Sequence, residues 1–365
     1  MDFSNLKAQY KAYKKEIDRA VVNVMTNAHF ILGPEVKTFE EEFKKYVGAD
    51  YAVSCANGTD ALHLALRAID IKPGDEVIVP SFTFIATAST VLLAGGKPVF
   101  ADIDPYTFNL DPVSLKKKIT KKTKAVVVVH LFGLPADLRE IKKICKKHHL
   151  ILIEDCAQAF GAKYKGKHVG TYGDIGCFSF FPAKNLGAYG DGGMTVTNKK
   201  NLAKRLTMLR FHGHKAKYKS QLLGFNSRLD TLQAAIMSIK LKHFKEELKV
   251  RREAAQFYNK NLSSPLIISK PENLKGYFHS FNYYTIRVKK RDALKEYLKS
   301  KGIPTMVYYP IPCHLQPALK YLGYKRGDLP VSEQMTKEVL SLPISGFVKK
   351  SELKEVVSNI VRVSI

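Results

Sequence analysis

Short apolar runs alternate with amphipathic segments over the first two-thirds of the chain. Runs of consecutive apolar residues predict buried strands, and apolar residues spaced three or four positions apart predict helices that cover them. The predicted strands are residues 51–54, 76–79, 97–101, 125–129, 150–154, 175–179 and 194–197, and helical patterns occupy 61–68, 136–148 and 201–209. Strands that alternate with helices in this way indicate an α/β fold with a mainly parallel sheet.

The pattern changes near residue 239. Residues 239–258 form a long charged helix, and the chain beyond it combines β patterns with further helices. We interpret this helix as a bridge between two units. The expected division is an N-terminal arm and large domain at residues 1–245 and a smaller C-terminal α+β domain at 246–365.

Size and composition indicate a globular protein. The 365 residues, 45% of them hydrophobic, are enough to bury a large core. The N-terminus mixes acidic and basic residues and lacks the apolar centre of a signal peptide. Residues 77–96 carry no charge and are long enough to span a membrane, but a proline and several hydroxyl side chains favour a strand, a turn and a buried helix. We therefore expect a cytoplasmic protein without a membrane segment.

The net charge of +26 first suggests a nucleic-acid partner or an anionic surface. Most of the basic residues, however, are lysines in short runs such as 116–118, on predicted helix faces and loops. No zinc-finger spacing or aromatic-interleaved RNA motif accompanies them, so we expect no nucleic-acid partner. The five cysteines form no CxxC pair and the histidines lack ligand-spaced partners, which predicts reduced thiols and no metal site.

One lysine differs from the others in its surroundings. Lys184 follows the apolar, aromatic-rich residues 177–183 and precedes the glycine-rich residues 185–193. Burial among aromatic rings should lower the pKa of its amine and favour the neutral, nucleophilic form. Such an amine can form a Schiff base. The alternative is a loop lysine whose ammonium group reaches solvent.

A carboxylate pair ends the apolar run at residues 151–155. Side chains at the carboxyl ends of strands in open α/β sheets point into the ligand crevice. Pyridoxal phosphate (PLP) combines with a lysine, and its ring works as an electron sink when a carboxylate keeps the pyridine nitrogen protonated. Asp155 is the candidate for this role, and strand alternation directs Glu154 to the other face. Alternatively, Asp155 caps a following helix.

Two further motifs lie where predicted strands end. Residues 57–60, Asn-Gly-Thr-Asp, join the first strand to a helix, whose free N–H groups attract a phosphate. Thr59 or Asp60 could instead be a simple helix cap. After the second strand, Phe82 or Phe84 could stack on a cofactor ring, although a buried core phenylalanine is the default. Periodicity does not decide between the two rings.

Taken together, these motifs resemble the DegT/DnrJ/EryC1/StrS family of PLP-dependent nucleotide-sugar aminotransferases. The likeness covers nearly the whole chain and is carried by residues 31–36, 55–62, 154–161, 179–187, 190–193, 224–235 and 309–314. It implies the three-layer α/β/α fold of type I PLP-dependent transferases, with a mainly parallel seven-stranded sheet and a smaller C-terminal α+β domain.

The resemblance also implies site roles. Lys184 would hold PLP as a Schiff base and move the proton during the reaction, and Asp155 would pair with the pyridine nitrogen. The other implied cofactor contacts are Gly58, Thr59 and Ser179 at the phosphate, Phe84 on the ring, Gln158 near the phenolic oxygen and Asn226 reaching the phosphate from a partner subunit. A homodimer with active sites at the subunit interface is therefore implied.

The implied reaction has two halves. L-glutamate converts PLP to pyridoxamine phosphate, and a keto-sugar on a nucleoside diphosphate then takes up the amine. Arg228 could bind an anionic substrate group or form a structural ion pair in the dimer. Tyr308 stands where many relatives have histidine, and Ala183 where threonine or serine often precedes the lysine. The sugar side of the pocket is expected around Arg228, Tyr308 and His314.

Residues 54–62 and 184–193 look most like enzymes that aminate C3 of UDP- or dTDP-linked 3-keto-sugars, for polysaccharide or related amino-sugar biosynthesis. C4-aminating relatives share most of these motifs and remain an alternative. A sugar dehydratase of the same fold has histidine at the lysine position, and a non-catalytic regulator would not need Lys184, Asp155 and Gln158. A nicotinamide dehydrogenase is disfavoured because no GxGxxG follows the first strand.

Overall fold

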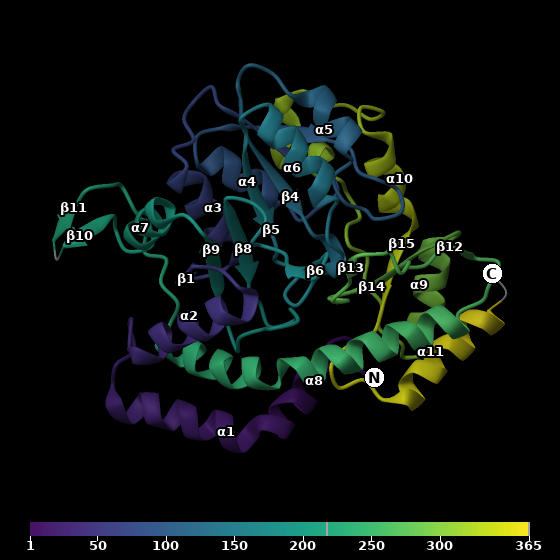
Figure 1. The fold of residues 1–365 in the computed structure, drawn as a ribbon. Helices are drawn as coiled ribbons and strands as arrows, with labels where there is room; N and C mark the ends of the chain where they lie inside the picture. The colour runs from purple at the N-terminus through teal and green to yellow at the C-terminus, as the bar shows by residue number, and fades with distance from the viewer. Residues whose placement is uncertain (217, 364–365) are drawn as a thin grey trace.

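The computed structural model describes residues 1–363 except residue 217. Its centre is a seven-stranded sheet in the order β1-β9-β8-β5-β4-β2-β3 (Figure 1). The strands are β1 (Tyr51–Cys55), β2 (Glu76–Pro80), β3 (Lys97–Ala101), β4 (Thr123–Val129), β5 (Ile151–Asp155), β8 (Ile175–Ser179) and β9 (Gly193–Thr197). All seven coincide with the strands predicted from the apolar runs, so the predicted α/β fold is confirmed.

The sheet is mainly parallel, as predicted. Strands β3, β2, β4, β5 and β8 pair in parallel, whereas β9 lies antiparallel between β8 and β1. A parallel connection needs a crossover, usually a helix. No helix separates β8 from β9, so the chain turns back on itself through residues 180–192. This turn presents Lys184 at the carboxyl end of β8.

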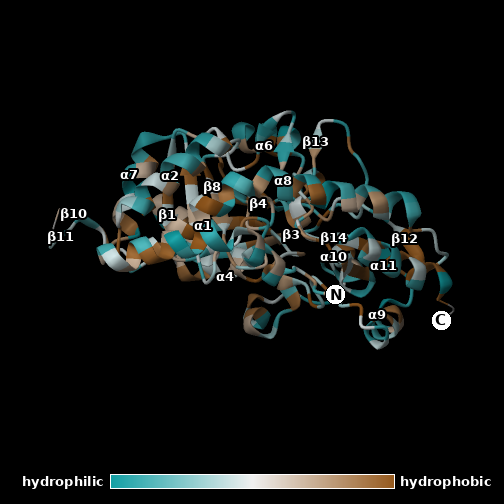
Figure 2. Ribbon diagram, turned by 90° about the horizontal axis from the view of Figure 1, so that it is seen from below, coloured by the Kyte–Doolittle hydropathy of each residue, from teal (hydrophilic) through white to brown (hydrophobic). Residues whose placement is uncertain are grey.

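Helices cover both faces of the sheet and complete three layers. One face packs against α3 (Gly58–Ala68), α4 (Ala86–Leu93) and α7 (Lys200–Leu209), and the other against α2 (Pro34–Val47), α5 (Pro112–Lys118), α6 (Leu138–Lys147) and α8 (Thr231–Asn261). Strand β2 shows the alternation, since Val77 and Val79 join the first core and Ile78 the second. In Figure 2 the outer helices carry many hydrophilic residues, whereas central strands such as β4 are mostly hydrophobic.

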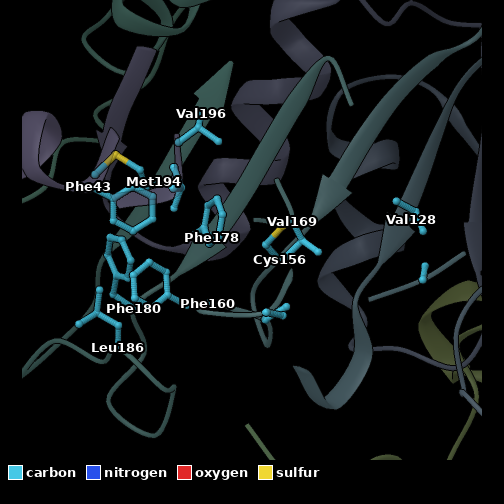
Figure 3. Close-up of a cluster of buried hydrophobic side chains, with 14 of the residues drawn as sticks. Phe43, Val128, Cys156, Phe160, Val169, Phe178, Phe180, Leu186, Met194 and Val196 are labelled. Carbon is cyan, nitrogen blue, oxygen red and sulfur yellow. The ribbon is translucent and has the colours of Figure 1, made fainter. Parts of the chain in front are cut away.

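Aromatic rings fill the core around the end of β8 (Figure 3). Phe43 of α2 stacks on Phe160 at 5.2 Å between ring centroids and contacts Phe178 edge-on at 5.1 Å. Phe180, two residues further along, also packs against Phe43. Full burial of one such side chain stabilises the fold by about 1.5–3 kcal/mol. These contacts fix the backbone just before Lys184.

A second, three-stranded sheet lies toward the C-terminal end of α8. It contains β12 (Ile267–Ser269), β14 (Tyr284–Val288) and β15 (Val339–Leu342), with α9 (Arg291–Ser300) and α11 (Lys350–Arg362) packed against it. Helix α8 begins earlier than predicted, because its first turns are apolar and buried rather than charged. It joins both cores, through Phe244 at the large sheet and Tyr258 at the small one. The predicted division at residues 245/246 falls inside α8 and stays a prediction.

The remaining elements lie around these two sheets. In the described part of the chain they are α1 (Leu6–Asn27), which packs along α8, α10 (Pro330–Glu338), three short 3-10 helices, the hairpin of β10 (His214–Ala216) with β11 (Lys219–Ser220), and the small sheet of β13 (Tyr277–Phe278), β6 (Lys163–Tyr164) and β7 (Lys167–His168). Among the described residues, no helix combines the length and apolar character needed to cross a membrane. The uncharged residues 77–96 form a strand, a turn and a buried helix, as predicted.

Candidate active site

A cavity of about 530 Å³ opens at the carboxyl ends of β2, β5 and β8. Eight of the site residues predicted from the sequence line it: Gly58, Thr59, Phe84, Asp155, Gln158, Ser179, Lys184 and Tyr308. The other lining residues include Asn57, Asp60, Thr83, Thr87, Phe181, Asp191, Tyr283 and Tyr309. The fold therefore gathers side chains from distant segments at the edge where open α/β sheets bind ligands.

The amine of Lys184 faces this cavity from the β8–β9 connection. Its backbone N–H donates to the Phe181 carbonyl at 2.8 Å, which closes a tight turn at the end of β8. Burial lowers the pKa of the Lys184 amine from 10.5 to about 8, while the charge of Asp155 opposes the shift. The lowered pKa agrees with the expectation from the aromatic surroundings. A substantial fraction of the amine is therefore neutral near pH 8.

Asp155 ends β5 on the cavity side. One carboxylate oxygen accepts the Ala157 N–H at 3.1 Å, and the other accepts the Thr87 hydroxyl at 2.9 Å. Burial raises the pKa of Asp155, while these hydrogen bonds and the nearby amine of Lys184 oppose the rise. The residues after Asp155 form turns rather than a helix, so the helix-cap alternative does not apply. The carboxylate is instead fixed from α4, through Thr87.

Glu154 points to the opposite face of the sheet, as strand alternation predicted. Its fully buried carboxylate lies 3.0 Å from His130 Nε2 and accepts backbone N–H groups of Gly170, Tyr172 and Gly173. Burial would raise the pKa of Glu154, but these bonds lower it overall. His130, Glu154 and Cys156 lie close enough to suggest metal ligands. The hydrogen bonds already occupy the carboxylate, so its role here is to hold the loop after β7 (170–173).

The N-terminus of α3 forms the second end of the cavity. Asn57 caps the helix by accepting the Asp60 N–H at 2.8 Å, so the cap is neither Thr59 nor Asp60. Within the described part of the chain, the N–H groups of Gly58 and Thr59 have no hydrogen-bond partner. A Cβ on Gly58 would lie 2.4 Å from Ser179 Cβ, so only glycine allows this close approach. Free N–H groups beside a serine hydroxyl fit an anion such as phosphate.

The sequence did not decide whether Phe82 or Phe84 faces the cavity, but the exposure of the two side chains does. Phe84 is 53% exposed and lines the cavity, whereas Phe82 is 1% exposed and lies in a core with Phe108 and Phe132. Only Phe84 is therefore placed to stack on a bound ring. The proline at the end of β2 and the turn after it break the alternation, and so periodicity could not separate the two residues.

Gln158 connects two segments at the cavity, the residues after β4 and the segment that carries Tyr309. Its Oε1 accepts the Phe132 N–H at 2.9 Å, and its Nε2 donates to the Tyr309 hydroxyl oxygen at 2.8 Å. Burial raises the pKa of Tyr309 well above its usual value, so its hydroxyl stays protonated. Tyr308 stacks on Tyr283 at 4.2 Å between ring centroids. The sequence marked Tyr308, but nothing in its pattern indicated Tyr283 or Thr87.

Asn226 and Arg228 do not line the cavity of their own chain. Asn226 is exposed, and the Arg228 guanidinium lies 4.8 Å from the centre of the Phe211 ring. Ser227 between them is buried and donates to Asp60 Oδ2 at 2.6 Å, which ties this segment to the first turn of α3. Within one subunit, neither predicted role can therefore be fulfilled.

His314 is buried and does not line the cavity of its own chain. The residue is 1% exposed, with Nδ1 2.6 Å from the Ser81 hydroxyl and Nε2 3.2 Å from Glu333. Both ring nitrogens are engaged in the interior of this chain, and the expected substrate contact stays a prediction. His314 fastens the segment after Tyr309 to the end of β2.

Together these groups fit PLP. The cavity offers an amine of lowered pKa, a fixed carboxylate, an exposed phenylalanine ring and unpartnered N–H groups with a serine hydroxyl. These are the groups that the aldehyde, the pyridine nitrogen, the ring face and the phosphate of this cofactor require. The arrangement suits transfer of an amino group through the cofactor.

Comparisons with known proteins agree with this chemistry. The model of the DegT/DnrJ/EryC1/StrS aminotransferase family matches residues 11–361. The chain is 49% identical to the "Pleiotropic regulatory protein" of Geobacillus stearothermophilus, and 44% identical to the UDP-N-acetyl-3-dehydro-alpha-D-glucosamine 3-aminotransferase of Acidithiobacillus ferrooxidans. Each match covers 98% of this chain and 96% of the relative. The solved structure of DesV from S. venezuelae in complex with a ketimine intermediate is similar with a TM-score of 0.96 and 39% identity, over 100% of this chain and 99% of that chain.

Proposed function

Because the chain belongs to the DegT/DnrJ/EryC1/StrS aminotransferase family, we propose that it is a PLP-dependent enzyme that moves an amino group from L-glutamate to a nucleotide-linked keto-sugar. The observation that carries this proposal is the meeting of Lys184 and Asp155 in one cavity, beside the N-terminus of α3. An amine of lowered pKa facing a fixed carboxylate is the arrangement that PLP chemistry needs.

Each residue has a distinct proposed role. When bound, PLP supplies an electron sink for the charge that develops on the reacting carbon. Lys184 holds the cofactor covalently and, once released by the amino donor, moves the proton between reacting carbon atoms. Asp155 holds the positive charge on the pyridine nitrogen. Gly58, Thr59 and Ser179 bind the phosphate through two N–H groups and a hydroxyl.

The alternatives differ in what they require of Lys184. A dehydratase of this fold has histidine there, and a non-catalytic regulator needs no reactive amine. The regulatory name of the Geobacillus protein belongs to that protein, and the intact site of this chain favours catalysis. The resemblance at residues 54–62 and the 3-aminotransferase relative favour C3 over C4 amination.

One subunit supplies more acidic than basic side chains to the cavity. Asp60, Asp155 and Asp191 line it, and Lys184 is the only lysine or arginine among the described lining residues. A carboxylate on the sugar would be paired by a residue of the second subunit, such as Arg228 of the partner subunit, because burying it without a partner costs free energy.

A substrate panel tests the function. The purified enzyme is incubated with PLP, L-glutamate and UDP- or dTDP-linked 3-keto- and 4-keto-sugars, and the products are identified by mass spectrometry and NMR. We expect amination at C3, and the panel includes both an uncharged 3-keto-hexose and a 3-keto-hexuronate so that the charge preference is measured. The proposal fails if glutamate leaves the visible absorbance of the enzyme unchanged and no sugar is aminated.

We further propose that the enzyme works as a homodimer. Asn226 and Arg228 do not line the cavity of their own subunit, and Phe84 and Phe181 are each 53% exposed beside it. A second subunit would cover these rings and could bring its own Asn226 to the phosphate. The molar mass in solution, measured by light scattering, tests this arrangement.

A cytoplasmic location also stays a prediction.

The rate at which the apoprotein takes up PLP should depend on pH through Lys184. The neutral amine attacks the aldehyde, and the Lys184 pKa lies at about 8 instead of 10.5. The rate should therefore rise about tenfold per pH unit below pH 8 and level off above it. Stopped-flow absorbance measures this rate, with the Lys184→Ala variant as background. A rate that keeps rising to pH 10 would show an ordinary lysine.

A further inference from the structure

Helix α8 holds the loop that carries Lys184. The ammonium group of Lys240 donates to the Gly187 carbonyl and lies 4.6 Å from the centre of the Tyr189 ring. Gln233 accepts the Tyr189 N–H at 2.9 Å and donates to the Tyr189 carbonyl at 3.1 Å. Residues seven positions apart lie on the same face of a helix, so both side chains reach the loop together.

Lys240 is an unexpected residue in this core. It is 1% exposed, and it forms no ion pair with a carboxylate among the residues that the structure describes. Burial lowers its pKa to about 8, with Glu247 opposing the shift and Arg251 adding to it. Burying an ammonium group costs several kcal/mol, whereas a methionine would fill similar space without this penalty. Stability alone therefore does not explain a lysine here.

The opposite side of the loop is held by other segments. Asn185 Nδ2 donates to the Ser280 carbonyl at 3.0 Å, and the Asn185 N–H donates to Asn282 at 3.2 Å. The loop is thus fixed on both sides, immediately after Lys184. Without the contact from α8, the residues after Lys184 would lose one of these two supports.

We propose that Lys240 is a positioning residue for Lys184. With Gln233, it fixes residues 187–189 so that the Lys184 amine keeps its place beside Asp155. This inference rests on the proposed function, because it gives Lys240 a part in the same reaction. A displacement of the reacting amine by about 1 Å can cost about 10²-fold in rate.

Replacing Lys240 with methionine tests the role in turnover. We expect kcat of Lys240→Met to fall about 10- to 100-fold while KM for glutamate changes less than about twofold. Lys240→Arg keeps a donor for Gly187 and should regain part of the loss. Lys242→Met, an exposed lysine on the same helix, is the matched control and should behave like the wild type. Equal kcat in Lys240→Met and Lys242→Met overturns the proposal.

Two measurements on the apoprotein separate positioning from a merely structural role. Hydrogen exchange of the amides in residues 185–190 should be faster in Lys240→Met, and uptake of PLP by Lys184 should be slower, although Tm stays near that of the wild type. Unchanged exchange and uptake, or a loss of activity that only follows a loss of folded protein, would overturn it. Neither measurement needs a sugar. If the wild type aminates no sugar, the proposed function fails while the effect on uptake still reports on Lys240.

Discussion

Lys184→Ala should abolish amino transfer and leave the fold intact. Removal of a positioned general acid–base alone costs about 10²- to 10⁴-fold in rate, and the covalent attachment of PLP is lost as well. The fold should tolerate the change, because the buried amine pays a desolvation cost that lowers its pKa to about 8. Coupled assays of glutamate turnover, with Tm measured in parallel, check both expectations.

Lys184→Arg is the matched variant for this test. Arginine keeps the positive charge and much of the side-chain volume, but its guanidinium stays protonated and forms no Schiff base. It should be as inactive as Lys184→Ala, and added methylamine should restore some turnover only to the alanine variant. If Lys184→Ala retains more than a few per cent of wild-type activity, another residue holds the cofactor.

Asp155→Asn should lower kcat strongly while PLP stays attached to Lys184. The amide keeps the size of the side chain but cannot hold a positive charge on the pyridine nitrogen. Removing one partner of a buried charged pair costs about 3 kcal/mol or more, which corresponds to about 10²-fold in rate. The visible spectrum reports the attached cofactor, and single-turnover kinetics with glutamate reports the chemical step.

Thr87→Val provides a graded comparison. It removes the hydroxyl that donates to Asp155 Oδ2 and leaves the carboxylate in place. The loss of one hydrogen bond to a charged group costs about 1.5–3 kcal/mol, so the effect on kcat should be smaller than that of Asp155→Asn. A larger effect for Thr87→Val than for Asp155→Asn would contradict this order and show that Thr87 acts on the reaction other than through Asp155.

The large sheet could be predicted from the sequence because its strands are buried on both faces. Apolar runs such as residues 125–129 have no amphipathic alternative. The end of the run at residues 151–155 indicated the cavity at Asp155, whereas Ser179 was implied by the family resemblance. The antiparallel placement of β9 could not be read from its own residues. The sequence predicted no helix between β8 and β9, but the position of β9 between β8 and β1 is known only from the strand pairing.

The site predictions that stay open depend on contacts with other segments of the chain or with a second subunit. His314 was assigned by its place in a motif, but its ring is held by Ser81 and Glu333, which are far from it in sequence. Lys240 looked like one of many lysines on a charged helix, because burial depends on what packs against that helix. For Asn226, a second subunit would have to provide the missing contact.

The hydrogen bond between Gln158 and Tyr309 joins the part of the chain before α8 to the part after it. Residues proposed to hold the cofactor all come before α8, whereas Tyr283, Tyr308 and Tyr309 come after it. A chimaera that exchanges only the residues after α8 for those of a relative would keep the Lys184 amine and replace Tyr283, Tyr308 and Tyr309. The residues before α8 would then determine the chemistry, and the residues after α8 would determine which acceptor sugar is bound. The chimaera must keep a hydroxyl at position 309 that accepts the hydrogen bond from Gln158.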